Sequence, residues 1–415
     1  MDTEGKEHKK KKRKKNQKWM KFRHRVVTEI ARAILKPITI LMFGVKVEKF
    51  KEQGKRPYLI LMNHQTTFDQ FFVGMSFKGP LYYVATEDIF SNGFVSSLIR
   101  YLVAPIPIKK QTTDVAAVIN CIKVAKEGGS IAIAPEGNRT YSGKTEYISP
   151  TIAALARKIK LPIALYRIEG GYGVQPRWSD KNRKGKMRSY VSKVIEPEEY
   201  AAMSNEELFS LIEQGLSVNE GVADAVFKSG KKAEYLERAI YVCPYCGLSE
   251  FESHGNEIEC KKCHKKIRYG EDKTLTGMGF EFPYRFVTEW YEAQKTFISN
   301  LDLTPYTENP LYFDRAKLSE VIVYKRKQLL KKDAEIKLYG NRIEIDEDSD
   351  GKISFPFDEV TAVSVLGRNK LNIYHDKRVY QLKGDKRFNA LKYVNIYYHY
   401  KNRNRGVTNG EFLGL

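Results

Sequence analysis

Short apolar segments that alternate with helical segments over residues 58–195 constrain the fold more than any other feature of this sequence. Helical spacing begins near Thr67 and recurs in 94–101, 114–126 and 151–158. This alternation predicts an α/β domain whose sheet is flanked by helices on both faces. After the last strand, Ser204 and Glu207 have the spacing of a capping box, which predicts the start of a helix. The segments with the composition of buried strands are 58–63, 81–86, 130–134, 162–168 and 187–195.

The start of the chain is strongly basic. The 415 residues carry a formal net charge of +21, and residues 1–25 contribute +9 of it through twelve Lys and Arg against three acidic residues. Residues 1–18 hold too few apolar side chains to pack into a core, so we expect a disordered basic tail. The charge predicts an anionic partner, which could be nucleic acid, an acidic membrane surface or a phosphorylated substrate.

Residues 19–50 combine apolar and basic residues with helical spacing, and Pro37 interrupts the segment, which predicts a pair of amphipathic helices. This pair could lie at a membrane surface, with its apolar side chains in lipid, or it could pack on the domain that follows. Charged residues interrupt the apolar run 26–47, so we expect no spanning helix, and we expect no secretory signal peptide. The side chains expected in lipid are Trp19, Phe22, Ile40, Leu41, Met42 and Phe43.

Polar residues follow two of the predicted strands at their carboxyl ends, where open α/β sheets place catalytic groups. His64 follows segment 58–63, and Asp69 comes five residues later. With His64 in a turn and Asp69 in the first turn of a helix, Asp69 can accept the Nδ1 proton while Nε2 takes a proton from a hydroxyl. Alternatively, Asp69 caps a helix and His64 belongs to the core. After segment 130–134, Gly137 allows close backbone approach to a ligand, and Arg139 offers a planar guanidinium to a phosphate.

The segments NHQTTFD (63–69) and EGNRT (136–140) resemble the two hallmark motifs of the glycerolipid acyltransferases. The best-known members of that family are the 1-acylglycerol-3-phosphate (lysophosphatidic acid) acyltransferases. Three further segments resemble other blocks of the family: APIPIKKQ (104–111), LPI (161–163) and GKMRSYVSKVIEPEEY (185–200). The resemblance spans about residues 25–215, and we expect the acyltransferase domain over 51–235.

The resemblance implies acyl transfer from acyl-CoA or acyl carrier protein to the free hydroxyl of 1-acyl-sn-glycerol 3-phosphate, which gives phosphatidate. It implies that His64 is the general base and Asp69 its orienting partner. Lys110 stands where arginine is usual and Asn138 where threonine is commoner, so another lysophospholipid is an alternative acceptor. The residues implied in substrate binding are Glu136, Gly137, Asn138 and Arg139 of the acceptor pocket, and Lys109 and Lys110, with Arg139 and Lys110 on the phosphate.

Residues 177–188 carry six cations and a single acid, Asp180. This segment could bind the phosphates of a thioester donor or the acidic surface of a carrier protein. It could equally be a solvated loop.

Two CxxC pairs predict a zinc ribbon over residues 240–272. Thirteen residues separate the pair Cys243 and Cys246 from the pair Cys260 and Cys263. Two tight turns with two thiolates each can surround one ion tetrahedrally, so we expect structural zinc bound by all four thiolates. His264 is an alternative ligand, and a redox dithiol is an alternative use of one pair. The cysteines suit a reducing compartment, and with the basic start they predict a peripheral enzyme on the cytoplasmic face of an anionic membrane.

Beyond the ribbon we expect a helical linker over 273–330 and a β-rich domain over 331–405. Period-two segments follow one another over 334–384, and residues 389–401 return to helical spacing. Strands closed by one helix are similar to the pleckstrin-homology/GRAM-like fold, which implies a lipid- or protein-docking module. A zinc ribbon in a basic chain also fits a nucleic-acid-binding protein, the alternative without enzymatic activity. Because the cations gather in a tail and one loop and no nucleic-acid module is recognisable, we expect no nucleic-acid partner.

Overall fold

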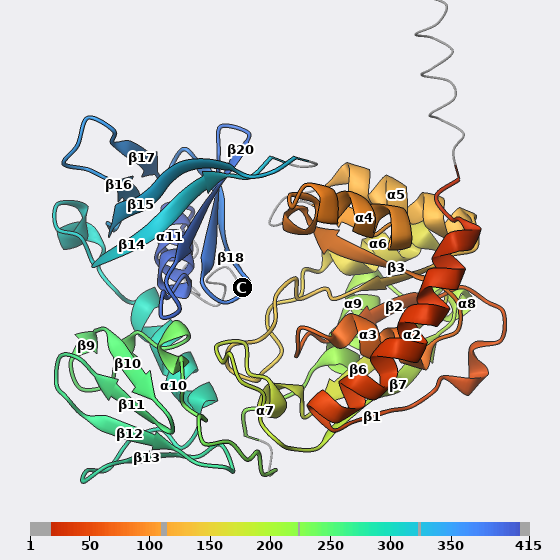
Figure 1. Cartoon of the computed structure of the whole chain (residues 1–415), viewed down its shortest axis with the longest axis horizontal. Helices are drawn as coiled ribbons and strands as arrows, with labels where there is room; N and C mark the ends of the chain where they lie inside the picture. Colours follow the sequence, from red (N-terminus) through yellow and green to blue (C-terminus); the bar gives the residue numbers. More distant parts are fainter. Residues whose placement is uncertain (1–17, 109–113, 223–224, 323–324, 407–415) are drawn as a thin grey trace, which may run out of the picture.

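The computed structural model of the chain describes residues 18–108, 114–222, 225–322 and 325–406. It comprises an α/β domain, a small ribbon that contains the paired cysteines, and a C-terminal domain of seven strands and one helix (Figure 1). The α/β core and the β-rich C-terminal region agree with the fold class expected from the sequence. The basic tail falls almost entirely on residues outside this description, so its disorder stays a prediction.

A seven-stranded sheet forms the centre of the α/β domain. The strand order is β1-β7-β6-β2-β5-β3-β4, and every neighbouring pair is parallel except β6 and β7. The five longer strands coincide with the predicted ones, whereas β1 and β4 have three residues each, too few to show a period. The strands are β1 (Val45–Val47), β2 (Leu59–Met62), β3 (Leu81–Thr86), β4 (Ile106–Ile108), β5 (Ser130–Ile133), β6 (Ile163–Glu169) and β7 (Met187–Ile195).

Helices cover both faces of this sheet (Figure 1). Leu59 and Leu61 of β2 pack into one apolar cluster with α5, α6 and α9, and Ile60 and Met62 pack into another with α3 and the end of α2. The alternation of these side chains explains why β2 is apolar throughout. The helices are α2 (Phe22–Phe43), α3 (Asp69–Ser76), α4 (Phe94–Val103), α5 (Val115–Lys126), α6 (Thr151–Ile159), α7 (Gly171–Val174), α8 (Pro197–Ala201) and α9 (Asn205–Leu216). Ser204 and Glu207 form the expected capping box of α9.

The predicted break at Pro37 is wrong, because α2 runs without interruption through this residue. Proline removes one amide donor from a helix, but it does not end a helix whose buried face is held by tertiary contacts. Thr39 is buried on that face, and its Oγ1 donates to the carbonyl oxygens of Leu35 (2.9 Å) and Lys36 (3.1 Å). Among the described residues, no helix has the length and apolar character required to cross a membrane.

Two of the side chains expected in lipid point into the protein instead. Phe43 is 2% exposed, and its ring packs on those of Phe68 and Phe72 with centroid distances of 5.0 and 5.6 Å. Trp19 is half-buried, and its Nε1 donates to the carbonyl oxygen of Ala104 at 3.0 Å. Phe43 lies on the face of α2 that packs against the protein, together with the buried Thr39.

The ribbon consists of short antiparallel strands, and it shares its core with its neighbours. Phe251, Ile258 and Ile267 belong to one apolar cluster with Trp290 of helix α10 (Val287–Ser299) and with the C-terminal domain. The ribbon is therefore packed against the rest of the chain. Its strands are β8 (Val242–Cys243), β9 (Gly247–Leu248), β10 (Phe251–His254), β11 (Glu257–Cys260), β12 (Lys266–Tyr269) and β13 (Leu275–Gly277).

The C-terminal domain is an antiparallel sheet of seven strands in the order β17-β16-β15-β14-β20-β19-β18, followed by helix α11 (Leu391–Asn404). Its likeness to the pleckstrin-homology/GRAM-like fold stays a prediction. The strands are β14 (Tyr312–Glu320), β15 (Gln328–Leu338), β16 (Arg342–Ile345), β17 (Ile353–Pro356), β18 (Val360–Leu366), β19 (Lys370–His375) and β20 (Arg378–Gly384).

The expectation of a helical linker over 273–330 is only partly correct. Helix α10 lies there, but strand β14 also lies there and pairs with both β15 and β20 inside the C-terminal sheet. The pairing of β14 with β15 shifts register between Ala316 and Ser319, which places Leu318 and Ser319 next to each other on the buried side. That irregularity breaks the period of two by which the sequence would have shown a strand.

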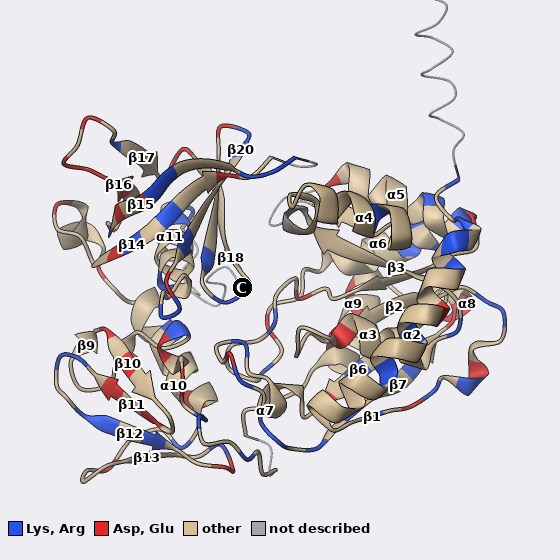
Figure 2. Cartoon of the chain, in the orientation of Figure 1, with Lys and Arg blue, Asp and Glu red and all other residues tan. Residues whose placement is uncertain are grey.

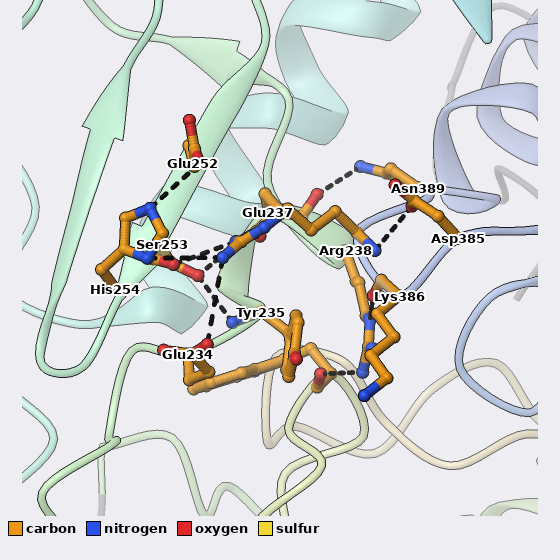
Figure 3. Close-up of polar contacts among 12 residues, drawn as sticks. Glu234, Tyr235, Glu237, Arg238, Glu252, Ser253, His254, Asp385, Lys386 and Asn389 are labelled. Carbon is orange, nitrogen blue, oxygen red and sulfur yellow. Dashed lines mark hydrogen bonds and ion pairs between the residues drawn. The ribbon is translucent and has the colours of Figure 1, made fainter. Parts of the chain in front are cut away.

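A buried arginine connects all three parts of the chain. Arg238 is 1% exposed, and its Nη1 donates to the carbonyl oxygen of Trp178 (2.8 Å) and to Asp180 (2.7 Å) in the α/β domain. Its Nε donates to the carbonyl oxygen of Lys386 (2.6 Å) in the C-terminal domain. Figure 3 shows that Glu237, beside Arg238, faces Ser253 of the ribbon and Asn389 beyond β20. These contacts fix the C-terminal domain relative to the α/β domain.

Replacement of Leu61 by alanine tests the packing of the central sheet. Leu61 is fully buried in β2, so Leu61→Ala should lower the free energy of unfolding of the α/β domain by about 2–5 kcal/mol. Ile119→Ala is the matched control, because Ile119 is 59% exposed in α5 of the same domain and should change this free energy by less than about 0.5 kcal/mol. Urea unfolding, monitored by hydrogen exchange, measures the free energy of unfolding of both variants. Equal losses of this free energy in the two variants would contradict the assigned core.

Candidate active site

His64 and Asp69 lie together after strand β2. The Nδ1 atom of His64 is 2.7 Å from Oδ2 of Asp69, because His64 lies in the turn that follows the strand and Asp69 begins helix α3. Asp69 is fully buried, whereas the His64 side chain is 25% exposed. Nε2 of His64 has no hydrogen-bond partner among the residues that the structure describes. In this geometry the proton on Nδ1 points toward the Asp69 carboxylate, which leaves Nε2 available to another group.

The buried carboxylate of Asp69 organises the turn around His64. Besides His64, it accepts hydrogen bonds from the backbone amides of Gln65 (2.7 Å) and Thr66 (2.9 Å) and from Oγ1 of Thr66 (2.6 Å). A carboxylate without these donors would be costly to bury. Gly171 at the start of α7 allows this turn to pack closely, since a Cβ there would lie 2.5 Å from Cβ of Gln65.

The EGNRT loop follows β5, and Glu136 connects it to the histidine turn. Oε1 of Glu136 accepts from the backbone amide of His64 (2.8 Å), and Oε2 accepts from the backbone amide of Glu146 (2.9 Å). Burial raises the pKa of Glu136 to about 8, even though both amides favour the charged form. Glu136 therefore stabilises the backbone at His64 and is not directed at a substrate. Gly137 adopts a positive φ of 67°, a backbone conformation that favours glycine.

Arg139 is the buried cation of this loop. It is 7% exposed, and Nη1 lies 3.5 Å from Oε1 of Gln175. Gln175 also accepts from the backbone amide and from Oγ1 of Thr67, both at 2.9 Å, so it connects the two motifs. No carboxylate among the described residues forms an ion pair with Arg139. Burial, and then the charges of Arg177 and Arg368, lower the pKa of Arg139 to about 9, so it remains protonated at neutral pH.

Asn138 is engaged by the basic loop 177–188. Its Oδ1 accepts from Nη2 of Arg177 (3.0 Å), and Nη1 of Arg177 donates to the carbonyl oxygen of Arg139 (2.8 Å). The Arg177 guanidinium lies over the ring of Tyr141, 4.2 Å from its centroid. Arg183 is also buried, and it donates to the carbonyl oxygen of Lys232 (2.6 Å). Two cations of the loop are thus structural, contrary to a fully solvated loop.

A cavity of about 580 Å³ lies beside the two motifs. Of the predicted substrate-binding residues that the structure describes, Arg139 lines it, whereas Glu136, Gly137 and Asn138 do not; the predicted catalytic pair, His64 and Asp69, does not line it either. Lys109 and Lys110 lie outside the described residues, so their predicted role is untested. Sequence reasoning missed Gln175 and Arg368, and no motif marks either of them. The lining residues are Met42, Thr67, Phe68, Arg139, Gln175, Asp180, Lys181, Asn182, Gly367, Arg368, Asn369 and Lys370.

The four paired cysteines converge in the ribbon. Their Sγ atoms all lie within 4.8 Å of one another, with 3.7 Å between Cys243 and Cys263 and 3.6 Å between Cys246 and Cys260. Gly247 has a φ of 73°, which suits the turn after the first pair. His264 is turned toward Glu259, with Nδ1 3.0 Å from its carboxylate. A cluster of four thiols could bind a zinc ion, which prefers four such ligands.

Comparison with known proteins finds similarity to acyltransferases over the α/β domain, and the family model and the sequence relative support acyltransferase function. Residues 44–168 match the family model described as Acyltransferase. The chain is 23% identical over 186 residues to the 1-acyl-sn-glycerol-3-phosphate acyltransferase of Bacillus subtilis (strain 168), covering 44% of this chain and 89% of that protein. The structure of the 1-acyl-sn-glycerophosphate (LPA) acyltransferase PlsC from Thermotoga maritima aligns with a TM-score of 0.41 and 22% identity, over 46% of this chain and 78% of that chain. The family match ends before the ribbon and the C-terminal domain.

Proposed function

We propose that this acyltransferase transfers an acyl group from an acyl-CoA or acyl carrier protein thioester to the free hydroxyl of 1-acyl-sn-glycerol 3-phosphate, which gives phosphatidate. The His64–Asp69 pair is the observation that supports this proposal most directly, because an alcohol needs a base to attack a thioester. The buried Arg139, at the end of the neighbouring strand, offers a cation to the acceptor phosphate. Asn138 stands where threonine is commoner in the family, and Arg177 donates to its side chain. Another lysophospholipid is therefore the second candidate acceptor.

In the proposed reaction, His64 acts as general base and then as general acid. Nε2 takes the proton of the acceptor hydroxyl while its oxygen attacks the thioester carbonyl, and Asp69 stabilises the imidazolium that forms. The tetrahedral intermediate collapses as the new C–O bond is kept and the C–S bond breaks. The imidazolium returns its proton to the departing sulfur, so the products are the ester and a free thiol. No acyl-enzyme is needed, because the thioester is already activated.

We propose that the enzyme lies on the cytoplasmic face of an anionic membrane through helix α2. Apolar side chains form a stripe along the outer face of α2, with Phe22 81%, Ile34 58% and Leu41 86% exposed. The stripe ends at Met42, which lines the cavity, so a lysolipid could pass from the membrane to the site. Figure 2 shows Lys and Arg at the start of α2, where anionic head groups would attract them.

We propose that the four cysteines hold one structural zinc ion. Four protein ligands would close its coordination shell, so the metal would take no part in acyl transfer. It would keep the two CxxC turns together within the ribbon. Because the ribbon shares its core with α10 and the C-terminal domain, loss of zinc should weaken this region without unfolding the whole chain.

The variant His64→Ala should lose at least about two orders of magnitude of acyl-transfer rate, since it lacks the base that Nε2 provides. The measurement is release of free thiol from acyl-CoA in the presence of 1-acylglycerol 3-phosphate, with product identified by thin-layer chromatography. His254→Ala is the matched control, because His254 is exposed in the ribbon and should retain wild-type activity. Wild-type turnover by His64→Ala would exclude the proposed mechanism, and a panel of lysolipids identifies the acceptor.

The double variant Ile34→Glu/Leu41→Glu should bind vesicles that contain anionic lipid about tenfold more weakly than the wild type, because two apolar contacts with lipid are replaced by charges. Phe313→Glu is the control, since Phe313 is 58% exposed in β14, far from the stripe in the sequence and on another domain. Vesicle flotation measures the bound fraction. Unchanged binding of the double variant would exclude α2 as the membrane surface.

Protein purified in a reducing buffer should contain about one zinc ion per chain, as elemental analysis would show. Cys263→Ala should lose most of the metal and lower the melting temperature, whereas His264→Ala should retain it, because His264 faces Glu259. Loss of zinc from His264→Ala together with its retention in Cys263→Ala would overturn the four-cysteine site.

A further inference from the structure

The cavity beside the two motifs has one wall from each of two domains. Thr67, Phe68 and Arg139 line it from the α/β domain. The turn between β18 and β19, with Arg368 at its centre, lines it from the C-terminal domain, some 300 residues later in the chain than His64. The lining holds four cations, Arg139, Lys181, Arg368 and Lys370, and a single carboxylate, Asp180. An excess of cations in a shared cavity is the signature of an anion site.

Contacts on both sides hold the β18–β19 turn in this place. Arg368 Nη1 lies 3.2 Å from Oδ1 of Asp180, which also accepts from the buried Arg238. Nδ2 of Asn369 donates to the carbonyl oxygens of Gly384 (3.0 Å) and Asp385 (2.6 Å). The network around Arg238 and Glu237 in Figure 3 anchors the segment that contains Asp385. Arg368 therefore reaches the cavity from an ordered turn.

Asp180 does not neutralise the cations around it. It lies between two guanidiniums, Arg238 and Arg368, so one positive charge of this group remains. Arg139 lines the same cavity and forms no ion pair with a carboxylate of the described residues. Arg368 is half-buried, with 29% of its side chain exposed, and its charge lowers the pKa of Arg139. Two guanidiniums that line one cavity repel each other, and an anion bound between them would offset this repulsion.

We propose that Arg368 of the C-terminal domain binds, together with Arg139, a phosphate ester of a substrate in this cavity. This inference rests on the proposed acyltransferase function and adds a second domain to its substrate site. The ester could belong to the head group of the lysophospholipid acceptor or to the coenzyme A of the donor. Planar guanidiniums suit either, because each can offer two parallel N–H donors to a phosphate. The C-terminal domain would then decide which phosphorylated substrate the α/β domain accepts.

The test compares the steady-state kinetics of Arg368→Gln with those of the wild type, in the full chain. Loss of one charged hydrogen-bond donor should raise the KM for the phosphorylated substrate about tenfold and leave kcat within about twofold. With monoacylglycerol, which carries no phosphate, the KM should not change if the acceptor is the source. A rise in the KM for acyl-CoA alone identifies the donor as the source. Arg368→Lys, which keeps the charge but loses the fork, should have an intermediate KM.

Arg378→Gln is the matched control, because Arg378 lies on β20 of the same domain, is 61% exposed and does not line the cavity. The wild type, assayed in parallel with His64→Ala, tests the proposed function separately: no thiol release by the wild type with any lysolipid would exclude that function, whatever Arg368→Gln does. If His64→Ala is inactive and Arg368→Gln keeps wild-type KM values for both substrates, the two-domain phosphate site is wrong. An equal melting temperature of Arg368→Gln and wild type shows that the substitution does not destabilise the fold. If the melting temperature of Arg368→Gln is lower, the KM of Arg368→Lys decides: a wild-type KM in a stable Arg368→Lys variant would contradict the role of the guanidinium.

Discussion

The buried carboxylate of Asp69 is the interaction on which the candidate active site depends. A carboxylate with no exposed surface must be surrounded by donors, and the donors here are three consecutive residues, His64, Gln65 and Thr66, in the turn after β2. The turn therefore takes one shape, and that shape orients the imidazole. Glu136 of the second motif accepts a hydrogen bond from the backbone amide of His64, so the second motif stabilises the backbone of the first.

The basic loop after α7 connects this site to the rest of the chain. Arg177 holds the EGNRT loop through Asn138 and the carbonyl oxygen of Arg139, and Asp180 holds Arg238 and Arg368. Both sets of contacts use charges that would be costly to leave unpaired in the interior. The loop is thus the joint between the α/β domain and the C-terminal domain, and it places the β18–β19 turn at the cavity.

Helix α2 has one face buried against the α/β domain and one exposed apolar face. Its inner face, with Thr39 and Phe43 buried, covers the sheet beside α3, and its outer face carries the apolar stripe from Phe22 to Met42. A helix this long is stabilised by the packing of the inner face, so Pro37 is accommodated within it. The outer face stays exposed, and in the proposed function it lies against an anionic membrane. This division explains why Phe43, although apolar, does not belong to the stripe.

Local sequence patterns were sufficient for much of this protein. The apolar segments predicted five strands of the central sheet, the capping box at Ser204 predicted the start of α9, and the positions of His64 and Asp69 after a strand predicted their pairing. These features depend on residues close together in the chain, whose spacing is preserved in the fold. Strand β14 was not predicted, because a bulge interrupts its alternation of buried and exposed residues. The three-residue strands β1 and β4 are too short to show such an alternation.

Contacts between distant residues could be learned only from the tertiary structure. Nothing near Arg368 in the sequence relates it to Arg139, which lies 229 positions earlier, yet both line one cavity. Arg177 and Arg183 read as part of a solvated basic run until burial against Tyr141 and Tyr269 gave them partners. The sequence by itself determined five strands of the central sheet, the motifs and the cysteine pairs, because each is a short-range pattern. Which cations are structural and which face the cavity depends on the packing of whole domains, and only the tertiary structure decided it.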